Sequence, residues 1–128
     1  MTLKEYFDTT RGHGVLATAN ARGQINMAMF ARPHVMDDGL LAFIMPQRLT
    51  HANLQENPHA AYLFWEEGPG YIGKRLYLTK VREEQDTPLL QSLRRRVYPP
   101  DKEKAAGPKF LVFFRLEKEL PLIGPGQI

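Results

Sequence analysis

Apolar residues in this chain alternate with polar ones or gather in short runs, a spacing typical of β-strands rather than of long helices. Glycine, proline, asparagine and aspartate bound these runs, as turns require. Seven segments are predicted to be strands on this basis: residues 14–19, 24–31, 34–36, 40–45, 60–65, 75–83 and 109–117. Because short turns join most of the first four, they favour an antiparallel barrel, mainly β in class, with helices at its periphery.

The first two strands are predicted to pair as a hairpin. Residues 20–23 have the length and the glycine placement of a hairpin turn. In the strand 24–31, one face is formed by Ile25, Met27 and Met29, and the other by Asn26, Ala28 and Phe30. Neither face carries a charge, so we expect both faces to be covered.

Two short helices have clear starting signals. Thr2 and Glu5 form a capping box that opens a helix running to Arg11. Thr87 and the proline after it open a helix over residues 87–97. Its apolar stripe consists of Leu89, Leu90, Leu93 and Val97. The arginines at positions 94–96 are expected to face solvent rather than a nucleic acid.

A polar corner and a third short helix connect two apolar strands in the middle of the chain. The first strand ends at Pro46, and the helix is predicted over residues 51–57. Thr50 is placed to cap this helix by accepting a hydrogen bond from the backbone N–H of Asn53 or its neighbour. With Arg48 beside it, the helix start outlines an anion site. A strand–turn–helix corner with a surface arginine explains the same residues, and on these residues alone it is the favoured interpretation.

Composition narrows the possible functions. The 128 residues predict one domain, 1–128, large enough to bury a core. The absence of cysteine excludes disulfides, thiol nucleophiles and cysteine-ligated metals. No apolar run reaches the roughly 20 residues that span a bilayer, so we expect a cytoplasmic protein without a membrane partner. Lysine and arginine outnumber aspartate and glutamate by only 17 to 14, which is little for a nucleic-acid binder and suits an anionic small ligand equally well.

The predicted apolar surface exceeds what one small barrel can bury. Both faces of residues 24–31 and 109–114 are apolar, and the tail 120–128 keeps Leu122, Ile123 and Ile128. Large exposed apolar patches usually mark interfaces. The sequence therefore predicts a homodimer.

Four strings, taken in order, resemble a known family. They are GVLATANARGQINMAMFARPHV, LAFIMPQRLTHANLQENPHAAYLFW, GKRLYLTKV and FLVFFRLEKELPLIGP. The most specific part is Thr50-x-x-Asn53-Leu54-x-x-Asn57-Pro58 between two apolar strands. Together they resemble the pyridoxamine 5′-phosphate oxidase-like family of FMN-binding split barrels, over about residues 12–126. The resemblance implies a six-stranded antiparallel split barrel that works as a homodimer and binds FMN in the cleft between subunits.

The resemblance also assigns cofactor contacts at the polar corner. Arg48, Leu49 and Thr50 match the segment that holds the FMN phosphate, with backbone N–H groups supplied by the helix start. Asn53 matches a polar position on the same helix that can face the phosphate or the ribityl chain. A plainer interpretation of Asn53, that it bonds its own helix, stays open.

The flavin ring is implied to lie along a strand. The residues whose backbone matches the isoalloxazine edge are Met27, Ala28, Met29, Phe30 and Ala31. Trp65 and Lys74 match walls contributed near the dimer cleft. Core packing also explains Met27, Met29 and Trp65, and for these three it is the favoured interpretation. Lys74 is equally consistent with a surface charge.

The sequence departs from the vitamin B6 oxidases of this family. Those proteins carry additional basic residues for a second phosphate, including a C-terminal segment with arginine and histidine, whereas the segment PLIGPGQI here has neither. We therefore do not expect oxidation of pyridoxamine phosphate. The chain resembles the short members of the family instead.

No side chain stands out as a general acid or base. The histidines at positions 13, 34, 51 and 59 are scattered, and none has the spacing of a metal site, so no catalytic residue and no metal are assigned. A flavin supplies its own hydride chemistry. The sequence thus predicts an FMN-binding flavoprotein, an oxidoreductase for an unidentified small molecule or electron partner. A non-catalytic FMN carrier, or a split barrel that binds haem, a deazaflavin or nucleic acid, stays open as an alternative.

Overall fold

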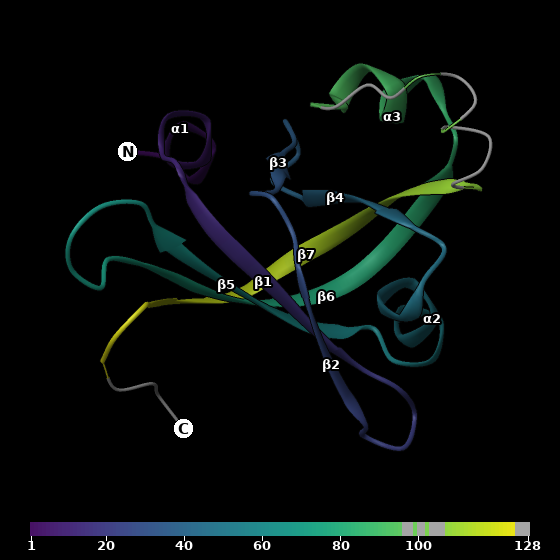
Figure 1. Cartoon of the computed structure of the whole chain (residues 1–128), viewed down its shortest axis with the longest axis horizontal. Helices are drawn as coiled ribbons and strands as arrows, with labels where there is room; N and C mark the ends of the chain where they lie inside the picture. Colours follow the sequence, from purple (N-terminus) through teal and green to yellow (C-terminus); the bar gives the residue numbers. More distant parts are fainter. Residues whose placement is uncertain (96–98, 100–101, 103–106, 125–128) are drawn as a thin grey trace.

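The computed structural model describes residues 1–95, 99, 102 and 107–124. Within this part of the chain, one antiparallel sheet of seven strands has the order β2-β1-β5-β6-β7-β4-β3, with three helices around it (Figure 1). The edge strands β2 and β3 do not pair with each other, so the curved sheet stays open between them. The expected mainly β, antiparallel class is confirmed.

The elements follow the predicted order, with small shifts at their ends. The strands are β1 (Gly12–Ala19), β2 (Ile25–Met29), β3 (His34–Val35), β4 (Leu41–Pro46), β5 (His59–Glu66), β6 (Gly73–Gln85) and β7 (Lys109–Pro121). The helices are α1 (Leu3–Thr9), α2 (Leu49–Glu56) and α3 (Pro88–Leu93). The described residues thus form seven strands rather than the six that the resemblance implied, because the short β3 pairs with the start of β4. No described helix is long and apolar enough to cross a membrane.

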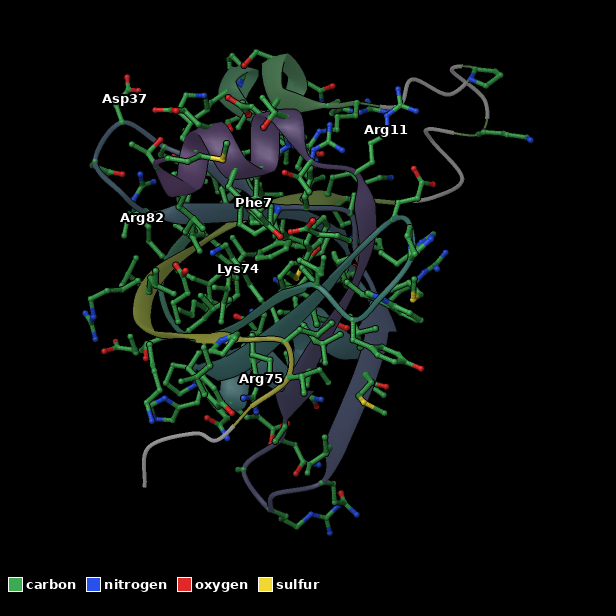
Figure 2. The ribbon with its side chains drawn as sticks, turned by 90° about the vertical axis from the view of Figure 1, so that its left-hand side faces the viewer. Phe7, Arg11, Asp37, Lys74, Arg75 and Arg82 are labelled. Atoms are coloured by element: carbon green, nitrogen blue, oxygen red, sulfur yellow. The ribbon has the colours of Figure 1, made fainter. Side chains whose placement is uncertain are left out.

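Large aromatic side chains are buried on both faces of the sheet, and all of the largest except Phe113 belong to the main core cluster. The largest fully buried ones are Tyr62, Phe7, Phe43, Phe64, Phe113 and Phe114. Phe7 projects from α1 toward the sheet (Figure 2) and packs edge-on against Phe64, with ring centroids 5.3 Å apart. On the other side of β4 and β7, Leu90 of α3 packs against Leu111 and Phe113. Strand β7 is therefore covered on both faces, which explains why both of its alternating sets are apolar.

Local capping signals fix the two outer helices. The N–H of Glu5 donates to Thr2 Oγ1 at 3.1 Å, as the capping box predicts. Helix α1 ends at Thr9, short of the predicted Arg11, because Gly12 already pairs in β1. The predicted cap of α3 at Thr87 is also observed, at 3.4 Å from the N–H of Leu90. Helix α3 ends at Leu93, before the predicted end at 97, and residues 96–98 lie outside the described part of the chain.

The predicted cap of the central helix is wrong. Helix α2 begins at Leu49, so Arg48 occupies the N-cap position and Thr50 lies within the first turn. The Arg48 N–H donates to Pro46 O at 2.9 Å, which turns the chain into the helix earlier than predicted. The buried Thr50 hydroxyl instead accepts a hydrogen bond from Asn26 Nδ2 at 3.3 Å and connects α2 to β2.

A single chain covers only one face of the second strand, so the prediction that both faces are covered is not met within one chain. Ile25, Met27 and Met29 are 76%, 72% and 68% exposed. Next to them, across β1, lie Leu63 and Trp65 of β5, which are 40% and 42% exposed. We call these five residues the outer apolar face. Core packing is therefore not the role of Met27, Met29 or Trp65 in the described chain, because β2 is an edge strand with nothing packed on that side.

Gly14 marks a close crossing that the fold requires. A Cβ built there would lie 1.8 Å from Tyr62 Oη and 2.5 Å from Phe30 O. Because an overpacked core position costs about 1–3 kcal/mol, Gly14→Ala is expected to lower the free energy of unfolding by about that amount in urea denaturation.

A second substitution tests the cause of that loss. Tyr62→Phe removes the contact with the hydroxyl but leaves those with the ring carbon Cζ at 2.4 Å and with Phe30 O, so the double variant should recover part of the penalty. A coupling of about 0.5 kcal/mol or more is expected for groups in contact. Strictly additive losses would show that the Tyr62 hydroxyl is not what excludes a side chain at Gly14.

Candidate functional site

A cavity of about 830 Å³ opens between β2, β4, the start of α2 and the end of α3. Its volume is within the range of small-molecule and cofactor sites. Its floor is β4, from Ala42 to Pro46, and one wall is the chain from Ala28 to Arg32. The walls are mainly apolar, and the polar groups are concentrated at the ends of β4. This arrangement suits a ligand with a flat apolar body and charged ends.

The cavity is cationic. Its charged lining residues are Arg32, Arg48, Arg94, Arg95 and Lys109. No aspartate or glutamate is among the described residues that line it. No group of three or more histidine, aspartate or glutamate residues in the described chain is arranged to hold a metal ion. The arrangement therefore favours an anionic ligand over a metal or a cation.

The structure brings most of the sequence-predicted site residues to this cavity. Those that line it are Ala28, Met29, Phe30, Ala31, Arg48, Leu49 and Thr50. Met27, Asn53 and Lys74 are not among its lining residues. Met27 lies on the same face of β2 as Met29, the outer apolar face, but one strand repeat further from the cavity.

Asn53 and Lys74 have other partners. Asn53 is buried, and its Nδ2 donates to Thr18 Oγ1 at 3.1 Å, so it connects α2 to β1 and does not bond its own helix through the side chain. Lys74 Nζ forms an ion pair with Glu119 at 2.7 Å and lies 4.6 Å from the centre of the Tyr6 ring. The described chain gives both residues a structural partner, and their contact with a cofactor stays a prediction.

One end of the cavity is the corner between β4 and α2. Arg48 lies at the N-cap, and Lys109 pairs with Pro46 across the sheet. In the described residues neither basic side chain has a hydrogen bond or an ion pair. The first N–H groups of a helix also lack intrahelical partners. Donors and positive charge therefore meet at this end without any acidic partner.

The other end lies beside β3. Arg95 Nη1 donates to the backbone oxygen of Arg32 at 2.7 Å, and Arg32 Nε is buried without a hydrogen-bond partner. Burial and the charges of Arg95 and Arg32 lower the pKa of His34 to about 4, so His34 is neutral at pH 7. Arg94 and Arg95 both line the cavity; Arg95 is exposed, as the sequence predicted, whereas Arg94 is only partly exposed. Arg96 lies outside the described residues.

A polar network that sequence reasoning did not find holds α2 against β6. His51 Nε2 and Glu83 Oε2 are 2.9 Å apart, and the His51 ring stacks on Phe110 at 3.8 Å. Gln55 and Lys80 donate to Glu83 Oε1 at 2.9 and 2.6 Å. A register shift in β6 between Lys80 and Arg82 turns Lys80 and Glu83 to the same side. The bulge is the non-local feature that makes this network possible.

No protein-family model and no curated protein matches the chain. Solved structures do match it. An FMN-binding protein from Syntrophomonas wolfei subsp. wolfei is 18% identical, with a TM-score of 0.73 over 96% of this chain and 85% of that one. An F420 reductase is also 18% identical, with a TM-score of 0.67 over 94% and 98% of the two chains. A protein from Lactobacillus delbrueckii, provisionally named a pyridoxamine 5′-phosphate oxidase, is 16% identical, with a TM-score of 0.66 over 94% and 93%.

At these identities the matches establish the fold. The chain has the fold of these proteins along most of its length, so the resemblance recognised in the sequence is confirmed at the level of architecture. The low identity also explains why the resemblance rests on the order of elements and a few short strings.

The network at Glu83 gives a pH-dependent prediction. Burial raises the pKa of Glu83, but hydrogen bonds from its three partners lower it further, to about 2. Glu83→Gln is expected to lower the free energy of unfolding at pH 7 by about 1–2 kcal/mol, allowing for partial solvent screening. Because the folded pKa is depressed, this stabilisation is present above the ordinary value of 4.5 and is lost as pH falls toward 2.

Urea denaturation of both proteins at several pH values measures the effect. The difference between wild type and Glu83→Gln should narrow steadily below pH 4.5. Glu67→Gln is the matched control, since Glu67 is exposed and its side chain has no hydrogen bond among the described residues, so it should change stability by less than about 0.5 kcal/mol. A gap that stays constant down to pH 3 would contradict the assignment.

Proposed function

We propose that this protein binds FMN in the cationic cavity and acts as an FMN-dependent oxidoreductase. The observation that supports this most directly is a cavity of cofactor size with mainly apolar walls, basic residues at both ends and no acidic side chain among its described lining residues. FMN has a flat ring system and a phosphate with nearly two negative charges. The shape and the charge of the cavity therefore fit FMN, and the fold is shared with a protein described as FMN-binding.

The corner end suits the phosphate. Arg48 offers a bidentate guanidinium and Lys109 a second positive charge, while the start of α2 adds oriented N–H groups. The Thr50 oxygen accepts a hydrogen bond from Asn26, which leaves its O–H able to donate to the phosphate. The N–H groups of the helix start and the Thr50 hydroxyl are held by the fold before any ligand binds, so they need little ordering on binding, whereas the exposed Arg48 side chain is ordered by the phosphate.

The edge strand suits the polar rim of the ring. The Phe30 N–H donates to Gly14 O at 3.0 Å, and hydrogen bonding alternates along an antiparallel strand. The backbone groups of Met29 and Ala31 consequently point to the open edge of the sheet, where no neighbouring strand pairs with them. These free N–H and C=O groups match the polar atoms of a flavin ring, which supports the position that the sequence resemblance implied.

The chain's own residues would bind and orient the cofactor. Bound FMN supplies the hydride and electron chemistry, so no protein acid or base is required for that step. Phe30, Ala42 and Pro46 form walls that keep water from the ring. The match to an F420 reductase supports a deazaflavin as the alternative cofactor, and a flavin carrier without activity is distinguished by turnover assays.

We further propose that a second copy of the chain covers the outer apolar face. This face exposes three methionine or isoleucine side chains on an edge strand, next to Trp65, and exposed apolar patches of this kind mark interfaces. Met29 belongs to this face and also lines the cavity. A partner seated on the face would therefore complete one side of the cofactor site.

Removing Arg48 should weaken FMN binding selectively. A hydrogen bond to a charged group contributes about 1.5–3 kcal/mol, so Arg48→Ala is expected to raise the Kd for FMN by about ten- to a hundredfold. Riboflavin lacks the phosphate and should bind the unaltered protein far more weakly than FMN. Fluorescence titration of both flavins measures this, and the variant should lose the preference for FMN over riboflavin.

Arg22→Ala is the matched control, because Arg22 lies in the β1–β2 turn and does not line the cavity. It should leave both affinities within about twofold. Equal binding of riboflavin and FMN by the unaltered protein would place the phosphate outside this corner. Failure to bind any flavin would contradict the proposed function itself.

A charge on the outer apolar face should separate the dimer. Met27→Glu places a carboxylate in the middle of the proposed interface, where burial without a partner costs several kcal/mol. Light scattering at micromolar concentration is expected to show a dimer for the unaltered protein and a monomer for the variant. Leu89→Glu, on exposed α3, is the control and should stay dimeric. A monomeric unaltered protein would refute the interface.

A further inference from the structure

We propose that Arg32 and Arg95 form a second anion subsite, at the β3 end of the cavity, which binds an oxyanion group of the substrate. This inference rests on the proposed function, since it places a substrate beside a bound flavin. It assigns the substrate a chemical class: a small molecule with a carboxylate or a phosphate group. The subsite is separate from the phosphate corner at Arg48.

The two basic ends are too far apart to serve one phosphate. Pro46 pairs with Lys109 at one end of β4, whereas Ala42 pairs with His34 at the other. A strand rises about 3.3 Å per residue, so the two positions are roughly 13 Å apart along β4. In Figure 1, α2 at one end lies well away from β3 and α3 at the other. An FMN phosphate at the corner would therefore leave the β3 end without a counter-charge.

Arg32 is poorly satisfied by the protein itself. It lies in the link between β2 and β3, lines the cavity, and is only partly exposed, and its Nε is buried without a hydrogen-bond partner among the described residues. A buried N–H of a charged group without an acceptor is destabilising, because the lost water is not replaced. An oxyanion in the cavity would supply the missing acceptor.

Arg95 reaches the same place from the end of α3. Its Nη1 donates to the Arg32 backbone oxygen at 2.7 Å, which fixes the guanidinium and leaves its remaining donors for a ligand. The Arg95 side chain is exposed overall, but partial burial and, less strongly, the nearby charge of Arg32 lower its pKa. The nearest carboxylate influence is Asp8 of α1, which does not line the cavity and already pairs with Lys4 at 3.0 Å.

Guanidinium groups select the ligand class. Their planar forks match the two oxygens of a carboxylate or of a phosphate, and charge-assisted pairs of this kind are about twice as strong as neutral hydrogen bonds. His34, neutral at pH 7, can add a hydrogen bond without adding charge. Binding of the oxyanion would place the rest of the substrate next to Phe30 and Ala31, and so beside the flavin ring that is proposed to lie there.

The test counts anion sites with and without the cofactor. Inorganic phosphate and malonate are each titrated by calorimetry into the apo-protein and into the FMN-loaded protein. A titration with chloride at the same ionic strength is the control. FMN-loaded protein should retain one anion site. Arg32→Ala and Arg95→Ala should each weaken that site at least about tenfold and change FMN affinity much less. Arg48→Ala should weaken FMN binding and change the affinity of the second anion site much less. Arg22→Ala should change neither of these two affinities.

Two further variants separate binding from folding. Arg32→Met keeps an apolar stem but removes the unpartnered buried donor, so it should raise the thermal midpoint or leave it unchanged while still weakening the anion. Arg95→Lys keeps the positive charge but loses the planar guanidinium, so the affinity of this variant for the anion should lie between those of wild type and Arg95→Ala. A loss of stability together with unchanged anion affinity in Arg32→Met would show a structural role instead.

The outcomes distinguish this subsite from the proposed function. A preference for malonate identifies a carboxylate substrate and a preference for phosphate identifies a phosphate ester, and both support the subsite. Loss of the anion site when FMN binds, or unchanged anion affinity in the Arg32 and Arg95 variants, would overturn it while leaving FMN binding intact. If the protein binds no flavin but still binds anions in a way that depends on Arg32 and Arg95, the subsite is supported and the proposed flavin binding is refuted.

Discussion

The open edge of the sheet is the constraint on which the rest of this structure depends. The chain passes from β2 directly to β3, which are the two ends of the sheet order, without pairing them. Unpaired strand edges expose backbone donors and acceptors and are normally covered or blunted. Here the edges border the cavity, so the hydrogen-bonding capacity that a closed barrel would use internally is available to a ligand. The cavity walls on both sides follow from that one gap.

The corner between β4 and α2 shows how distant contacts position a binding group. Arg48 has no partner of its own among the described residues, but the helix that follows it is tied to three strands. Thr50 bonds Asn26 of β2, Asn53 bonds Thr18 of β1, and His51 bonds Glu83 of β6. The helix side chains therefore face the sheet, and the exposed N-cap faces the cavity. A short helix with little stability of its own is held in one orientation by these bonds.

The sequence was sufficient wherever the cause of the structure is local. Strand periodicity, the Thr2 and Thr87 caps and the stop at Pro46 each depend on a few neighbouring residues, and all appear as expected. It was insufficient where tertiary contacts decide. Thr50 has the chemistry of a cap, but the chain turned into the helix earlier and left its hydroxyl to β2. Likewise, the apolar pattern of β2 does not reveal whether the strand lies at the edge of a sheet or in its centre. The cavity arginines next to α3 come from a return of the chain that no periodicity reveals.

The imbalance of charge in the cavity has a consequence for encounter as well as for binding. The whole chain carries a formal net charge of +3, yet the part that the structure describes places five basic side chains and no acidic one in the lining of a single cavity. A concave surface of one sign focuses its electric field into the solvent, over a Debye length of about 8 Å at physiological ionic strength. Anions should therefore arrive faster than neutral molecules of the same size, and added salt should slow their arrival. The field does not distinguish one anion from another of the same charge. Selection among anions therefore depends on how well each one fits the cavity walls once it has arrived.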